Sequence, residues 1–112
     1  MSERHQNEVA VKVTLTQIDD EIRASVAGEI DADNCKSFAD PFVGTEGVAL
    51  TGNKIVLDAA ELSFIDSSGV SELLRIRDAA AQHGGSLVID APTPAVRRVL
   101  EITGLLATFG LA

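Results

Sequence analysis

The spacing of the apolar residues changes along this chain, and that change limits the folds it can adopt. Near the N-terminus apolar residues alternate with polar ones, first over residues 9–15 and again over residues 22–26. An alternation with a period of two is typical of half-buried strands. Because only the short polar segment 17–21 separates them, we expect the two strands to form an antiparallel hairpin. Gly28 is expected to end the second strand.

A helical spacing follows the hairpin. It begins near Asp31 and continues through Ala32, Cys35, Phe38 and Ala39. Asp31 or Asp33 is available to cap the start of this helix. Pro41 is expected to end it, because proline lacks the N–H that the next helical hydrogen bond needs. Residues 42–53 contain three glycines and no clear period, which predicts a loop with a helical turn.

The C-terminal half shows a strand followed by a helix, twice. Residues 54–57 and 87–89 are short apolar runs, as in strands that are covered on both faces. A helix that Gly84 stops follows the first run, and a helix that Thr93 caps follows the second. Strands joined in this way run parallel, through right-handed crossovers. The sequence therefore predicts a single α/β domain: a mixed sheet of four to five strands, with an antiparallel N-terminal hairpin and parallel C-terminal strands, packed with helices.

Length and charge restrict the classes of function. The 112 residues suit one compact domain, and we expect a flexible N-terminus over 1–8 and the domain over 9–112. The net charge of −8 repels nucleic acid and anionic membranes, so a protein partner fits better. No apolar run approaches the ~18 residues of a membrane span. The N-terminus also lacks the features of a secretory signal, which predicts a cytoplasmic protein.

The residue inventory argues against an enzyme. A serine hydrolase needs a base beside its nucleophile. One histidine, His5, lies in the N-terminal segment, and the other, His83, lies at the far end of the helix that Ser67 would begin, over ~20 Å away at ~1.5 Å rise per residue. No glycine-rich phosphate motif and no metal-ligand spacing occurs, so we expect neither cofactor nor metal. The single Cys35 is interpreted as a small buried apolar residue, with a redox role as the alternative.

An aspartate offers an alternative chemistry. Asp58, expected at the C-terminal edge of its strand, could accept a phosphoryl group as the aspartate of a receiver domain does. Asp19 and Asp20 would then be the acidic pair that holds magnesium. That pair lies where the hairpin turn is expected, however, and the predicted strands are one too few for a receiver.

Residues 64–70, Phe-Ile-Asp-Ser-Ser-Gly-Val, place two hydroxyls where a buried strand gives way to a helix. The first N–H groups of a helix lack partners within it, so a side-chain oxygen can cap them and a phosphate is stabilised there. Ser67 is therefore either a cap or a site of phosphorylation, and Ser68 is interpreted as a cap. Asp66 either supports the turn or faces a partner. Gly69 either permits close packing or leaves room for a phosphoryl donor.

Four segments of the chain, in the right order, resemble the STAS family, the fold of bacterial anti-sigma factor antagonists. They are Gly28-Glu29-Ile30-Asp31, residues 55–58 with 64–70, residues 84–89 and residues 96–105. The resemblance covers nearly the whole domain from residue 9. It implies that Ser67 is the phospho-acceptor, and that partner binding involves the residues around it: Asp31, Asp66, Ser67, Ser68 and Gly69.

The resemblance also implies a mechanism of partner switching. Similar proteins, when unphosphorylated, bind an anti-sigma factor that is also a serine kinase, and so release a sigma factor. Phosphorylation by that kinase ends the binding, and a metal-dependent serine phosphatase restores it. The expected role is thus regulation of transcription without catalysis. The alternative is a STAS scaffold that does not switch, such as an accessory subunit of a stress-signalling complex or of a transporter, in which Ser67 is only structural.

Overall fold

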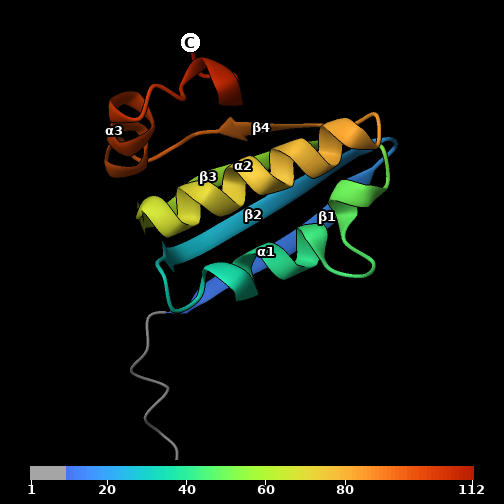
Figure 1. The fold of residues 1–112 in the computed structure, drawn as a ribbon, viewed down its shortest axis with the longest axis horizontal. Coiled ribbons are helices and arrows are strands. Elements are labelled where there is room, and N and C mark those ends of the chain that lie inside the picture. The colour runs from blue at the N-terminus through green and yellow to red at the C-terminus, as the bar shows by residue number, and fades with distance from the viewer. Residues whose placement is uncertain (1–9) are drawn as a thin grey trace, which may run out of the picture.

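Four strands and three α-helices make up the fold in the computed structural model, which describes residues 10–112 (Figure 1). The expected flexible segment 1–8 lies outside the described residues. In chain order the elements are β1 (Val11–Ile18), β2 (Glu21–Ile30), α1 (Cys35–Val43), β3 (Lys54–Ile65), α2 (Ser67–Gln82), β4 (Ser86–Asp90) and α3 (Pro94–Ile102). Two short 3-10 turns, η2 (Val48–Leu50) and η3 (Ala107–Phe109), complete the list.

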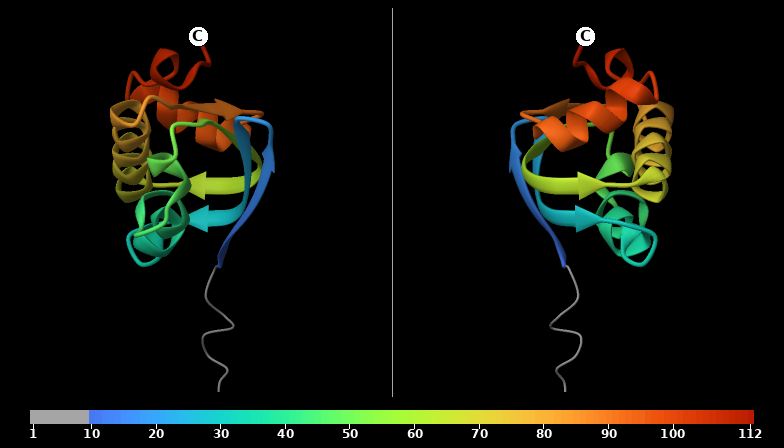
Figure 2. Two further views of the ribbon diagram at one scale, coloured as in Figure 1. Left: turned by 90° about the vertical axis from the view of Figure 1, so that its right-hand side faces the viewer. Right: turned by 90° about the vertical axis from the view of Figure 1, so that its left-hand side faces the viewer.

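The strands form one mixed sheet in the order β1-β2-β3-β4. β1 pairs with β2 antiparallel, and β2, β3 and β4 are parallel. The predicted fold class and the N-terminal hairpin are therefore confirmed, with four strands in the sheet. Figure 2 shows α1 and α2 together on one side of the sheet. α3 lies apart from this pair and packs against β3. Among residues 10–112, no helix comparable to α1 and α2 covers the opposite face of the sheet.

The hydrophobic core lies between the sheet and the pair α1 and α2. Alternation along the strands decides which side chains reach it, because paired residues in adjacent strands share a face. Ile22 of β2 is aligned with Ile55 of β3 and Leu87 of β4, and all three are buried. The helices contribute Phe38 and Phe42 from α1 and Leu73, Ile76 and Ala80 from α2. Each large apolar side chain buried in this way contributes about 1.5–3 kcal/mol of transfer free energy.

Both central strands are longer than the sequence predicted. Gly28 does not end β2, which continues to Ile30, and the expectation was wrong because Gly28 lies in a β-bulge. Its φ is +107°, and a Cβ atom there would meet the backbone oxygen of Ala10. β3 likewise continues to Ile65, so Asp58 lies inside the strand and not at its edge. The polar residues of 58–63 point away from the core, so this part of the strand lacks the continuous run of apolar residues that predicted residues 54–57.

The helix ends follow local chemistry, with one exception. Pro41 lies inside α1, so the expected end there was wrong. The helix continues past Pro41 because the proline, near the helix end, removes only one hydrogen bond. The next residue, Phe42, is fully buried, and Gly44 N still donates to Asp40 O. The predicted loop with a helical turn is confirmed over residues 44–53, where η2 forms, whereas residues 42 and 43 belong to α1. Thr93 caps α3, as predicted.

Candidate functional site

The candidate site lies where β2 and β3 end side by side. Ile30 and Ile65 are the last paired residues of the two strands, and Asp66 N donates to Ile30 O at 3.1 Å. β2 then leads towards α1, and β3 leads directly into α2. Asp31 and the segment 66–69 therefore meet at one edge of the sheet, as the resemblance implied. In Figure 1 this edge is the left-hand end of β2 and α2.

Asp66 is the residue that caps α2. Its backbone is extended, with φ −106° and ψ −173°. Its Oδ1 accepts hydrogen bonds from Ser68 N at 2.9 Å and from Gly69 N at 3.2 Å. The interpretation of Ser68 as the cap was therefore wrong, and of the two alternatives for Ser67 the cap is excluded, since both serines already lie within the first turn. A carboxylate at this position also interacts favourably with the positive end of the helix dipole.

Ser67 is the first residue of α2, and its side chain is exposed. Its hydroxyl forms no hydrogen bond within residues 10–112, because Asp66 satisfies the helix N-terminus instead. Ser68, next to it, is half-buried. The chain thus presents one accessible hydroxyl, without a structural role of its own, at the edge where β2 and β3 end.

Gly69 is buried beneath this turn. A Cβ atom built on it would lie 2.5 Å from Cγ1 of Ile65 and 2.8 Å from Cγ2 of Ile30, well inside van der Waals contact. The absence of a side chain therefore lets α2 begin directly against the ends of β2 and β3. Of the two interpretations of Gly69, close packing is the one that this geometry favours.

Asp31 organises the turn that leads from β2 into α1. Its Oδ1 accepts from the backbone N–H groups of Asp33 and Asn34, at 2.9 and 3.1 Å. In return Asp31 N donates to Oδ1 of Asn34, whose amide also donates to Glu29 O. The expectation that Asp31 or Asp33 caps α1 was nevertheless wrong: the N-cap residue is Asn34, without a side-chain cap hydrogen bond, because the turn that Asp31 organises precedes the helix, which begins only at Cys35. Its side chain is half-buried, so part of it still faces solvent at this edge of the sheet.

The two segments that build the site carry only negative charges. Residues 24–35 and 55–74 contain no Lys or Arg. They hold seven carboxylates: Glu29, Asp31, Asp33, Asp58, Glu61, Asp66 and Glu72. Two of the seven are paired with arginines from outside these segments, Asp58 with Arg23 and Glu72 with Arg75. Asp31 and Asp66 therefore place negative charge at the edge that carries Ser67 before any modification, and such charges repel one another across a few ångströms.

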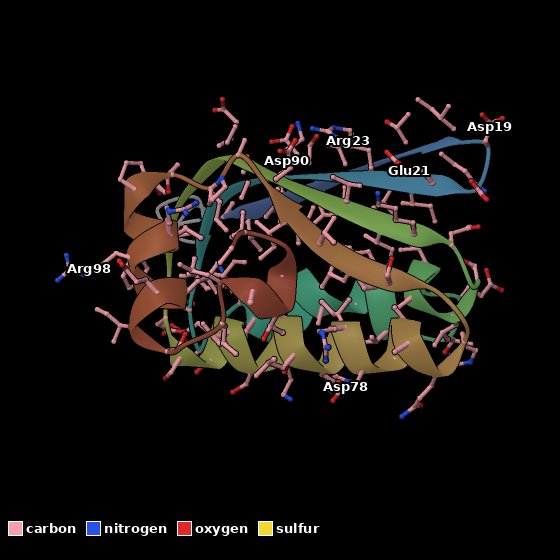
Figure 3. The ribbon with its side chains drawn as sticks, turned by 90° about the horizontal axis from the view of Figure 1, so that it is seen from above. Asp19, Glu21, Arg23, Asp78, Asp90 and Arg98 are labelled. Carbon is pink, nitrogen blue, oxygen red and sulfur yellow. The ribbon has the colours of Figure 1, made fainter. Side chains whose placement is uncertain are left out.

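Asp58 belongs to a different part of the molecule. It lies on the sheet face opposite α1 and α2. There the Arg23 guanidinium forms ion pairs with two carboxylates, Asp58 at 3.6 Å and Asp90 at 2.8 Å. Figure 3 shows Arg23 and Asp90 together on that face. The hydrogen bond to Asp90 raises the pKa of the Arg23 guanidinium. Sequence reasoning missed this ion-pair network, because it depends on the register that brings β2, β3 and β4 together.

The geometry that a receiver domain needs is not present. Asp19 and Asp20 form the hairpin turn, with φ +56° at Asp19, whereas Asp58 is aligned with Ser25, well along β2. Within residues 10–112 no three His, Cys, Asp or Glu residues are grouped so as to hold a metal ion. Asp58 already serves as an ion-pair partner of Arg23.

The remaining sequence candidates lie away from the site or inside the core. Cys35 is buried at the start of α1, as predicted. His83 lies just after the last residue of α2, at the opposite end of that helix from Ser67, with Nδ1 2.9 Å from Ala79 O. No helix in the described part of the chain is long and apolar enough to cross a membrane.

Comparisons with known proteins agree with this architecture. The family described as "Mlab, STAS domain" matches residues 13–108. BtrV of Bordetella bronchiseptica, provisionally named an anti-sigma factor antagonist, is 29% identical over 102 residues, which cover 91% of this chain and 86% of BtrV.

Two solved structures show the same fold. An anti-sigma factor antagonist from Mycobacterium paratuberculosis superimposes with a TM-score of 0.78 at 24% identity, covering 90% of this chain and 84% of that one. The anti-sigma factor antagonist SpoIIAA in its unphosphorylated form superimposes with a TM-score of 0.61 at 25% identity, covering 84% and 82%. With a family match across most of its length and a sheet of matching topology, this chain belongs to the STAS domain family.

Proposed function

We propose that this protein is an anti-sigma factor antagonist whose binding is switched by phosphorylation of Ser67. In its unphosphorylated form it binds an anti-sigma factor that is also a serine kinase, and so releases a sigma factor. The observation that carries the proposal is the exposed Ser67 hydroxyl at the first position of α2, beside a helix cap that Asp66 already provides. Modification of Ser67 therefore removes no hydrogen bond from the fold.

The physical effect of the phosphate follows from its position. It adds about −1.5 to −2 charges at a helix N-terminus, where the dipole tolerates them. The same charge enters an edge that already carries Asp31 and Asp66. A docked partner must then bury an unpaired dianion, which costs a few kcal/mol, and ~1.4 kcal/mol is already a tenfold change in affinity. Local charge thus changes binding without refolding the domain.

The relatives support this role. BtrV carries the name of an anti-sigma factor antagonist, and SpoIIAA is an antagonist whose structure was determined specifically in its unphosphorylated form. No histidine lies beside Ser67 in the described residues, so we infer that Ser67 is a substrate for another protein's active site. The partners are then an anti-sigma factor with serine kinase activity and a metal-dependent serine phosphatase, and the place of action is the cytoplasm.

The test is to map the phosphate directly. The purified protein is incubated with ATP and each candidate anti-sigma factor kinase of the same bacterium, and the phosphate is located by mass spectrometry. We expect one phosphate on the wild type and on Ser68→Ala, and none on Ser67→Ala. Ser68 is the matched control, because it is the neighbouring hydroxyl in the same helical turn.

Three results would contradict the proposal. Label on Ser68 would move the acceptor by one residue. Acid-labile phosphate on Asp58 would revive the receiver alternative. No label, together with stable retention of the protein in a large complex, would favour the scaffold that does not switch.

A further inference from the structure

Phe64 is the exception among the aromatic side chains. The chain contains four phenylalanines and no tyrosine or tryptophan. Three of them, Phe38, Phe42 and Phe109, have no exposed surface, whereas Phe64 is 44% exposed. A phenylalanine is a large apolar group, so leaving it in water forgoes much of the free energy that burial would give.

The backbone of β3 holds Phe64 in this exposed position. Leu62 and Ile65 both point into the core, so Ser63 and Phe64, two consecutive residues, both point outward. The pairing with β2 shifts register between Gly28 and Glu29, which places Phe64 opposite Glu29. The Ser63 hydroxyl donates to Gly28 O at 3.0 Å and fixes the irregularity. A β-bulge of this kind redirects side chains, here towards solvent.

Phe64 is also close to the proposed phosphorylation site. Only two residues separate it from Ser67, so their Cα atoms are at most ~11 Å apart. One partner in a protein–protein interface of ordinary size buries about 800 Å², which is enough to cover both residues. An interface of ordinary size that is centred on Ser67 is therefore large enough to include the ring.

We propose that Phe64 is the apolar anchor of the interface with the anti-sigma factor, a proposal that rests on the function proposed above. The partner surface that fits has an apolar pocket for the ring and basic residues at its rim. The pocket follows from the exposed ring, since buried aromatic anchors dominate the binding energy of many interfaces. The basic rim follows from the surrounding charge, because Glu29 is aligned with Phe64 across the two strands and Asp66 lies two residues after it.

Ile18 provides a matched control. It is 64% exposed and lies at the last position of β1, aligned with Glu21 at the start of β2. Phe64 is aligned with Glu29, eight residues further along the same strand. At about 3.3 Å per residue the two side chains are separated by about 26 Å along the sheet. Both substitutions to alanine remove an exposed apolar side chain, and only one of them is near Ser67.

The experiment measures the dissociation constant for the anti-sigma factor kinase that labels Ser67, by isothermal titration calorimetry at low and at high salt. We expect Phe64→Ala to weaken binding about tenfold or more and Ile18→Ala to change it by less than about twofold. We also expect the affinity of the wild type to fall as salt is raised, because a basic rim contacts an acidic edge. Thermal unfolding of each variant, followed by circular dichroism, shows that the fold is retained.

Each other outcome has a definite meaning. Binding of Phe64→Ala at the wild-type affinity, while phosphorylation of Ser67 still abolishes binding, overturns the anchor and leaves the proposed function intact. An equal loss with Ile18→Ala also overturns it. Absence of wild-type binding to every kinase of the host, with no label on Ser67, refutes the function and the anchor together. Where Phe64→Ala lowers the melting temperature, Phe64→Thr decides, because threonine keeps a high strand propensity while removing the apolar ring: weaker binding supports the anchor, and wild-type binding overturns it.

Discussion

Substitution of Gly69 by alanine tests whether the start of α2 depends on close packing. The added Cβ would lie 2.5 Å from Cγ1 of Ile65 and 2.8 Å from Cγ2 of Ile30, whereas carbon atoms in contact are separated by about 3.5–4.0 Å. Each isoleucine must therefore retreat by about 1 Å. Both are at most 1% exposed, so neither has free space to enter.

The magnitude follows from two opposing terms. Overpacking of a full core costs about 1–3 kcal/mol. Alanine is more favourable than glycine in a helix by up to about 1 kcal/mol, which offsets part of the cost. We expect Gly69→Ala to lower the free energy of unfolding by about 1–2 kcal/mol net. For a domain of this size that corresponds to a fall in melting temperature of about 4–8 °C.

The assay is urea denaturation followed by circular dichroism, with Ser71→Ala as the control. Ser71 is exposed in the next turn of α2, so alanine there gains helix propensity without any steric cost. We expect Ser71→Ala to be as stable as the wild type or slightly more stable. A Gly69→Ala variant as stable as Ser71→Ala would refute the packing argument, and would return Gly69 to the role of leaving room for a phosphoryl donor.

Three further predictions concern the same region and the bulge beside it. Asp66→Ala should lower the free energy of unfolding by about 0.5–2 kcal/mol, because the helix loses its cap. Asp66→Asn retains an oxygen acceptor and should lower it by only a few tenths of a kcal/mol. Urea denaturation of both variants measures the difference, and equal losses would contradict the role of Asp66 as the cap. Gly28→Ala should cost more than about 1 kcal/mol and more than Gly104→Ala, because both have positive φ but only Gly28 faces a backbone oxygen. Phosphorylation of Ser67 should leave the circular dichroism spectrum unchanged and the melting temperature within a few degrees of the unmodified protein; unfolding on phosphorylation would show that the charge acts on the fold and not on a partner.

The sequence was most informative where a single local signal decided the structure. Strict alternation was enough to predict the β1–β2 hairpin, because a period of two has no helical interpretation. Thr93 followed by Pro94 was enough to predict the start of α3, since the hydroxyl caps it and proline fits its first position. Gly84, with φ +83°, was enough to predict the end of α2.

Prediction failed where several local choices were equally good or where tertiary contacts decided. Asp66, Ser67 and Ser68 are all good cap residues, and only the extended backbone at Asp66 selects it. Pro41 is tolerated inside α1 because the buried Phe42 holds the following turn against the core. The outward position of Phe64 depends on the register of β3 against β2, which no local pattern reveals.

In the proposed mechanism, phosphorylation of Ser67 decides whether the partner stays bound. The most direct measurement is the dissociation constant of the anti-sigma factor kinase for the unmodified protein, for the stoichiometrically phosphorylated protein and for Ser67→Ala. We expect the phosphate to weaken binding by about thirtyfold or more, while Ser67→Ala, which cannot be phosphorylated, should bind within a fewfold of the unmodified protein. Equal affinity of the phosphorylated and unmodified proteins would contradict this mechanism.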